Sequence, residues 1–204
     1  AGFCGLMLKC TPAALIPRPE TEILVEHAAK ILGESSPGLV IDVGTGTGAI
    51  PLALARKQPA FQYLGLDISD DALALAAENA AASASAPPAG TSVTWKKSNL
   101  LEGVTESAAL ITANLPYLTP AEIESAEPEV RHDPRLALEG GADGLDLIRR
   151  LIPQAFRLAP ALLLECGPEQ APKVADLARE AGFTQVAIHP DLTSRPRVVE
   201  ARRT

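Results

Sequence analysis

Short apolar runs alternate along this chain with longer segments in which apolar residues recur every three or four positions. A run of about five apolar residues between turn residues is typical of a buried strand, and the longer spacing is typical of a helix with one buried face. The predicted strands cover residues 39–42, 62–67, 93–97, 110–114 and 161–165, and the predicted helices cover residues 20–31, 49–57, 70–79, 143–158 and 170–181. Pro19 is expected at the first position of its helix, and Ser69 at an N-cap.

Repeated strand-helix units predict an α/β fold with a doubly wound, mostly parallel sheet and right-handed crossovers. Two further short segments, 185–189 and 197–201, are expected to pair as a closing antiparallel hairpin, which brings the sheet to seven strands. We expect one domain over residues 1–204, with residues 1–37 leading into a core at 38–204. The pattern does not fix the order of the strands.

Composition limits the kinds of partner that the chain can bind. A net charge of −7 and a pI near 5.0 disfavour nucleic-acid binding through phosphate neutralisation but permit a basic protein partner. The three cysteines and three histidines show no metal-ligand spacing, so we expect no metal and no disulfide framework. No apolar run is long enough to span a membrane. A cytoplasmic monomer is the expectation, although Ala1 at the start indicates a piece of a longer protein, which could then be mitochondrial.

A glycine-rich turn directly after the first predicted strand carries the strongest chemical signal. Alternating glycines at a strand-to-helix turn let backbone amides approach a ligand closely, at the edge of a parallel sheet where ligands bind. About 20 residues later Asp67 ends the next strand, at the position of a carboxylate that holds two ribose hydroxyls. The turn reads Asp42, Val43, Gly44, Thr45, Gly46, Thr47, Gly48.

These features alone leave the ligand open. Gly44, Gly46 and Ala49 also satisfy the glycine spacing of nicotinamide-dependent reductases, and a tight turn without any ligand is a further alternative. Asp42 favours S-adenosylmethionine, because methyltransferases commonly carry an acid at this position, near the ammonium group of the ligand.

The segment Asn114-Leu115-Pro116-Tyr117 follows an apolar strand and resembles the Asn/Asp-Pro-Pro-Tyr motif of amino-group methyltransferases. An amide nitrogen is a poor nucleophile, because its lone pair is delocalised into the carbonyl. A site must therefore accept hydrogen bonds from the amide N–H groups and aim the nitrogen at the sulfonium methyl. The Asn114 side-chain oxygen and the Leu115 carbonyl can accept such bonds, and Tyr117 can pack against the reacting group.

Flanking segments make the resemblance more specific. Several segments resemble the release-factor glutamine N5-methyltransferases, and the similarity runs from about residue 2 to 202. These segments are residues 15–22 (Leu-Ile-Pro-Arg-Pro-Glu-Thr-Glu), 129–131, 134–141, 143–145, 163–165 and 197–199. The resemblance implies a seven-stranded, Rossmann-like class I methyltransferase fold. It also implies methylation of the glutamine in the Gly-Gly-Gln loop of a peptide chain release factor, with S-adenosylhomocysteine as product.

The same resemblance assigns the site residues. Residues 44–48 would hold the methionine part of the donor, Asp67 the ribose, and Asn99 and Leu100 the adenine. Asn114 to Tyr117 would clamp the glutamine, with Asn114 also beside the donor. Arg18 and Glu20 would shape the rim near the substrate, or else form a charge pair at a helix start.

Three departures from the family pattern are visible. The family usually has Pro where Leu115 stands, and Asn-Leu-Pro-Tyr is familiar from adenine-N6 methyltransferases, so methylation of adenine in RNA or DNA is the main alternative. The family usually has Asp where Asn99 stands, and the changes at Leu115 and Asn99 together leave a non-catalytic binding module as another alternative. The helical N-terminal domain of the family is also absent from this sequence.

Overall fold

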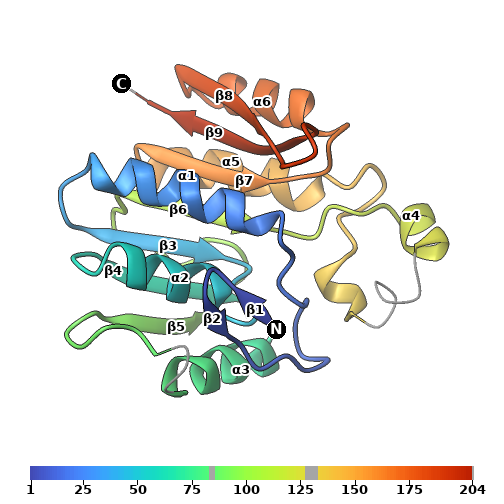
Figure 1. The fold of residues 1–204 in the computed structure, drawn as a ribbon. Coiled ribbons are helices and arrows are strands. Elements are labelled where there is room, and N and C mark those ends of the chain that lie inside the picture. The colour runs from blue at the N-terminus through green and yellow to red at the C-terminus, as the bar shows by residue number, and fades with distance from the viewer. Residues whose placement is uncertain (83–85, 127–132, 204) are drawn as a thin grey trace.

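The computed structural model describes residues 1–82, 86–126 and 133–203, and its centre is a seven-stranded sheet (Figure 1). The family-like segment 129–131 and the histidine at 132 lie outside the described residues. The strand order is β5-β4-β3-β6-β7-β9-β8, in which the first five strands are parallel and β9 runs antiparallel to both of its neighbours, β7 and β8. The strands are β3 Leu39–Val43, β4 Gln62–Asp67, β5 Val93–Lys97, β6 Leu110–Asn114, β7 Ala161–Glu165, β8 Gln185–Pro190 and β9 Pro196–Arg202.

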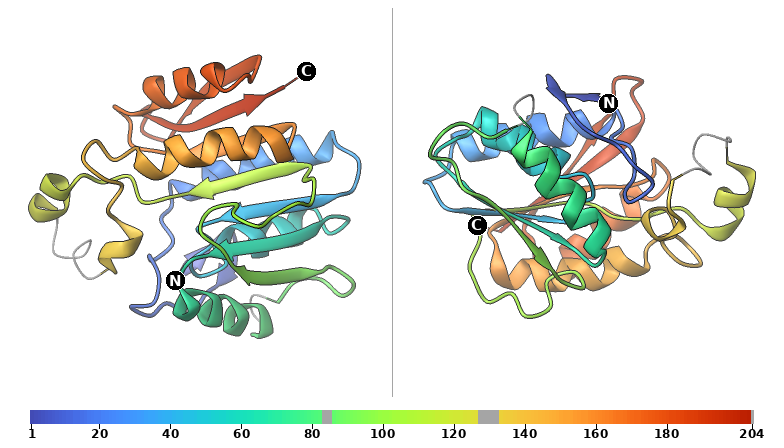
Figure 2. Two further views of the ribbon diagram at one scale, coloured as in Figure 1. Left: turned by 180° about the vertical axis from the view of Figure 1, so that it is seen from behind. Right: turned by 90° about the horizontal axis from the view of Figure 1, so that it is seen from below.

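Helices cover both faces of the sheet (Figure 2). Two of them, α1 and α2, pack on one face with Val40 and Leu163, while α5 and α6 pack on the other face with the next residues along the same strands, Ile41 and Leu164. This alternation confirms the doubly wound fold predicted from the sequence. The helices are α1 Thr21–Gly33, α2 Ala49–Lys57, α3 Asp70–Ala81, α4 Pro120–Ser125, α5 Asp146–Leu158 and α6 Ala171–Glu180.

All seven predicted strands and the closing hairpin are confirmed, with bounds that differ by at most one residue at either end. Ser69 is confirmed as the N-cap of α3, because its hydroxyl accepts a hydrogen bond from the Ala72 amide at 3.2 Å. The prediction for Pro19 was wrong. It lies outside α1, whose N-cap is Glu20, because a turn of hydrogen bonds from residues 21–23 back to 18–20 precedes the helix.

The predicted start of the helix at residue 143 was also wrong, since α5 begins at Asp146. Gly144 has a positive φ of 72°, and a Cβ there would lie 2.1 Å from the Tyr117 carbonyl oxygen. Residue 144 therefore has to be glycine in this arrangement, because the backbone turns tightly over the segment after β6 before the helix starts. The spacing of apolar residues in the sequence does not reveal a turn of this kind.

Several short elements escaped the sequence analysis. They are the hairpin of β1 (Gly2–Phe3) and β2 (Leu6–Met7), the helix α4 and a 3-10 turn at Arg135–Ala137. Phe3 and Leu6 are buried against the α1 side of the sheet, so the hairpin belongs to the core. Within the described ranges, no helix has the length and apolar character needed to cross a membrane.

Candidate active site

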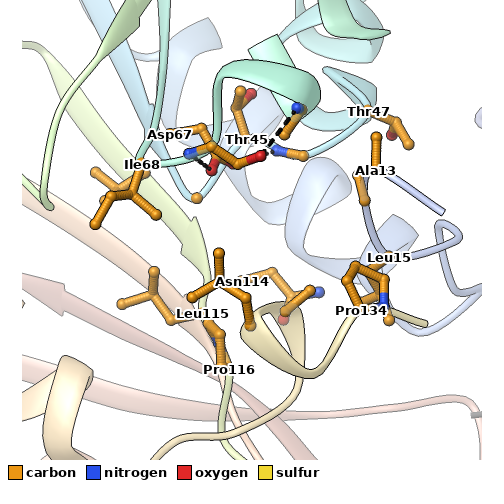
Figure 3. Close-up of a pocket in the computed structure, with 18 of the residues that line it drawn as sticks. Ala13, Leu15, Thr45, Thr47, Asp67, Ile68, Asn114, Leu115, Pro116 and Pro134 are labelled. Carbon is orange, nitrogen blue, oxygen red and sulfur yellow. Dashed lines mark hydrogen bonds between the residues drawn. The ribbon is translucent and has the colours of Figure 1, made fainter. Parts of the chain in front are cut away.

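A cavity of about 470 Å³ lies over the carboxyl ends of β3, β4 and β6, where the strand order reverses direction. Ligands of open α/β sheets bind at this point, and the volume suits a small-molecule ligand. Asp67 and Asn114 face each other across the cavity, and Pro134 closes a third side (Figure 3). The predicted site residues that line it are Arg18, Gly44, Thr45, Gly46, Thr47, Asp67, Asn99, Leu100, Asn114, Leu115 and Pro116.

The glycine turn is held to the neighbouring strand by its own backbone. The Gly44 and Thr45 amides both donate to the Leu66 carbonyl, at 2.8 and 2.9 Å. Gly44 has a φ of 73°, and a Cβ on it would lie 3.0 Å from Leu115 Cδ2. The loop and the segment after β6 are therefore in direct contact, which no local pattern in the sequence predicts.

Asp67 is fixed at the edge of the cavity by two backbone amides. Its Oδ2 accepts from the Gly46 amide at 2.9 Å and its Oδ1 accepts from the Ser69 amide at 3.0 Å (Figure 3). Such charge-assisted bonds orient the carboxylate, and each oxygen keeps a second lone pair for a ligand hydroxyl.

Asp42 and Gly48 belong to the predicted turn but do not line the cavity. Asp42 is buried beneath the loop, where it accepts a hydrogen bond from the Thr112 hydroxyl at 2.7 Å. Burial raises the pKa of its carboxyl to about 6. Gly48 packs against Trp95, and a Cβ there would lie only 2.8 Å from the indole ring. Both residues are therefore placed to support the loop from below.

Asn99 and Leu100 line the cavity after β5. The Asn99 amide oxygen accepts from Arg150 at 3.2 Å, while its nitrogen donates to Glu102 at 2.9 Å. Leu100 has a φ of 56°, a conformation that costs a leucine roughly 1–2 kcal/mol. Strained backbone of this kind is concentrated at ligand sites.

Asn114 ends β6, and its side-chain nitrogen donates to Thr21 Oγ1 at 3.1 Å. Glu165, the register partner of Asn114 on β7, lies buried behind the pair. Burial raises the pKa of the Glu165 carboxyl to about 7, although hydrogen bonding to Thr21 and the charge of Arg197 lower that pKa. No local pattern marks Thr21 as a site residue, whereas Glu165 ends a predicted strand and could have been found by that criterion.

Tyr117 does not line the cavity, although a position walling the reacting group was expected. Its hydroxyl lies 3.5 Å from an Arg197 guanidinium nitrogen, and its carbonyl accepts from the Gln170 side chain at 2.8 Å. Burial raises the pKa of the Tyr117 hydroxyl. In this structure Tyr117 ties the segment after β6 to β9 and α6.

Arg18 lines the cavity and pairs with Asp133 at 2.6 Å, whereas Glu20 is the N-cap residue of α1 and does not line the cavity. Asp133 is buried and also accepts from the Ile16 amide at 3.2 Å. The partner of Arg18 is therefore more than a hundred residues away in the sequence, and the alternative of a local pair with Glu20 is not what the structure shows.

Two histidines that appeared scattered in the sequence lie together in the fold. The His27 and His189 rings stack with centroids 3.7 Å apart, and His189 Nε2 lies 2.8 Å from a Glu200 oxygen. The spacing of the histidines in the sequence gives no sign of this cluster, which forms because α1 and the closing hairpin meet at this point. None of the three residues lines the cavity.

Comparison with known proteins defines the class of protein. Residues 19–130 match the family model of the methyltransferase small domain. The fold resembles a ribosomal protein L11 methylase from Lactobacillus delbrueckii subsp. bulgaricus (TM-score 0.63, 21% identity, 94% of this chain and 82% of that one). It also resembles the N-terminal domain of human METTL16 in complex with SAH (TM-score 0.64, 16% identity, 98% and 76%). The protein is an S-adenosylmethionine-dependent methyltransferase.

Sequence relatives narrow the class to one family. The chain is 46% identical to a release factor glutamine methyltransferase of Deinococcus radiodurans, over 98% of this chain and 70% of that protein. It is 39% identical to one of Caulobacter vibrioides, over 97% and 69%. The chain belongs to the release factor glutamine methyltransferase family. This membership excludes the nicotinamide-dependent reductase that the glycine spacing alone left open.

The residues around the cavity fit the methyl donor. A Cβ at Gly44 would lie 3.0 Å from Leu115 Cδ2, so a side chain there would crowd the cavity wall. The fixed Asp67 carboxylate suits the two ribose hydroxyls, and the apolar wall of Ile68, Leu100 and Leu147 suits a purine ring. The donor brings an activated methyl group on a sulfonium when it is bound.

Proposed function

We propose that this protein transfers a methyl group from S-adenosylmethionine to the side-chain amide nitrogen of a glutamine in a peptide chain release factor. The glutamine is that of the Gly-Gly-Gln loop. The observation that carries the proposal is the Asn114 side chain, which lines the donor cavity at the end of β6 with its nitrogen bound to Thr21. Its oxygen is then left to accept a hydrogen bond from a substrate amide.

The donor is held on the β3–β4 side of the cavity in this proposal. Residues 44–47 line the side of the cavity that takes the methionine part, Asp67 holds the ribose, and Asn99 and Leu100 flank the adenine. Asp42 acts from beneath the loop, because its buried carboxylate places negative charge below the region of the ammonium group.

The substrate amide is held on the opposite side, by Asn114 and by the Leu115 carbonyl, with Pro116 along the wall. Two acceptors on the amide N–H groups turn the nitrogen toward the methyl group and hold it there. The methylated nitrogen sheds its proton after transfer, so positioning contributes more to the rate than acid-base chemistry does. Arg18, braced by Asp133, and Leu136 form the rim over which the peptide loop enters.

The experiment is transfer of labelled methyl groups from S-adenosylmethionine to a purified release factor. The matched control is the same factor with its Gly-Gly-Gln glutamine changed to alanine, and a second control is a ribosomal RNA fragment. Label on the native factor alone supports the proposal. Label on the alanine variant contradicts the assignment of the target residue, and label on the RNA instead favours the adenine alternative suggested by Asn-Leu-Pro-Tyr.

A further inference from the structure

Glu165 and Asn114 lie opposite each other at the carboxyl ends of β7 and β6, as register partners in the parallel sheet. Neighbouring strands are about 4.8 Å apart, so the two side chains on the same face are within reach of each other. Thr21, at the start of α1, contacts both of them. Glu165 is only 1% exposed, and Thr21 only 4%. A buried carboxylate therefore lies directly behind the asparagine that faces the cavity.

The hydrogen bonds among these three side chains have a defined direction. The Asn114 nitrogen donates to Thr21 Oγ1 at 3.1 Å, so this hydroxyl still has its own hydrogen to donate. An ionised carboxylate can only accept. Thr21 and Asn114 are both hydrogen-bonding neighbours of Glu165. Asn114 and Thr21 are therefore the donors of this cluster, and Glu165 is its acceptor for as long as it is ionised.

We propose that Glu165 is a positioning residue whose carboxylate, acting through Thr21, fixes which way the Asn114 amide faces. With Nδ2 turned toward Thr21, Oδ1 faces the cavity as an acceptor. In the flipped amide, Oδ1 would point at the buried carboxylate and Nδ2 would point at the N–H groups of the substrate. Both contacts are repulsive. The inference rests on the proposed function, in which Asn114 Oδ1 accepts from the glutamine amide.

Protonation of Glu165 would remove this constraint on the orientation of the Asn114 amide. Burial raises the pKa of Glu165 to about 7, the Thr21 bond and the Arg197 charge oppose that rise, and Glu20 adds to it. Tyr117 and Cys166 also face the carboxylate, and its charge contributes to the raised pKa of each. A protonated Glu165 can donate to Thr21, which reverses the bonds and lets the Asn114 amide flip. The methyl-transfer rate should therefore fall as the pH drops through the Glu165 pKa.

The first test compares Glu165→Gln with Thr21→Val and Thr21→Ser in the release-factor assay. Glu165→Gln should lower kcat about 10- to 100-fold, the size seen when the support of a ligand-holding side chain is removed, with donor affinity unchanged by calorimetry. It should also abolish the fall of kcat at low pH. Thr21→Val should lower kcat by a similar factor. Thr21→Ser, which keeps the hydroxyl, should retain most of the wild-type kcat. A wild-type pH profile in Glu165→Gln, or equal rates for the two Thr21 variants, would overturn the inference.

A second measurement needs no substrate, so it separates this inference from the proposed function. The Asn114 side-chain amide signals are followed in ¹⁵N–¹H spectra against pH, and are assigned by their loss in Asn114→Ser. In the wild type they should shift with the Glu165 ionisation, and in Glu165→Gln they should not. Signals that do not move with pH in the wild type overturn the inference, whatever the activity. Moving signals without transfer to a release factor overturn the proposed function alone.

Discussion

Gly44 lies against Leu115, so closely that a Cβ on the glycine would come within 3.0 Å of the leucine Cδ2. One residue belongs to the loop on the donor side of the cavity, and the other to the segment on the substrate side. This contact sets the distance between the two halves of the site. The buried Leu115 side chain fills the space against the loop.

The Gly44–Leu115 contact predicts a coupling between two substitutions. Gly44→Ala should destabilise the protein by more than the roughly 1–2 kcal/mol of a left-handed alanine, because its methyl group also meets Leu115. Gly103→Ala is the matched control, since Gly103 has a similar φ of 70° with nothing within 4 Å. Urea unfolding should show that Gly44→Ala with Leu115→Ala costs less than the sum of the two single changes. A loss of unfolding free energy in the double variant equal to the sum of the two single losses would contradict the steric contact.

Asp67 should act on donor binding. Asp67→Asn removes the charge from a carboxylate that two backbone amides hold in place, so the donor should bind about 10- to 100-fold more weakly. Calorimetry with S-adenosylhomocysteine measures this effect directly. Asp70→Asn is the control, because Asp70 is exposed and pairs only with Lys97 among the described residues. Normal donor affinity with slower turnover would contradict the ribose role of Asp67.

Asn114→Ala should act on turnover. Loss of one preorganised polar contact costs about 2–4 kcal/mol of transition-state stabilisation, while the affinity for the donor changes much less. Single-turnover transfer and donor calorimetry on the same preparation separate the two effects. Unchanged turnover in this variant would rule out Asn114 as part of the clamp.

His27 should make the protein less stable in mild acid. Burial, and then the adjacent His189, lower the pKa of His27 below its ordinary value of about 6.5. The unfolded chain then binds the proton more readily, so stability is present above about pH 6.5 and is lost as the pH falls through the folded pKa. His27→Gln should lose less stability than the wild type between about pH 8 and about pH 5.5. Arg56→Gln, on the exposed side of α2, should behave as the wild type does.

Central strands such as Leu110–Asn114 and Ala161–Glu165 could be predicted because each is a short apolar run ended by turn residues. Their order could not, because it depends on which strands pair across long crossovers, such as β3 with β6. Gly44, Gly46 and Asp67 were found from local spacing, and the structure brings them to one cavity.

Contacts made by distant segments could not be predicted in the same way. Asp133 beneath Arg18 and the stack of His27 on His189 depend on packing between parts of the chain that share no local pattern. The role of Glu165 could be predicted only in part. It ends a strand next to Asn114, but its buried position and its contact with Thr21 are properties of the folded sheet.

The most direct test of the central claim is mass-spectrometric mapping of a release factor after incubation with S-adenosylmethionine and either the wild type or Asn114→Ala. The account predicts one added methyl group on the side chain of the Gly-Gly-Gln glutamine with the wild type, and a strongly reduced amount with the variant. A methyl group on another residue, or equal modification by both proteins, would contradict it.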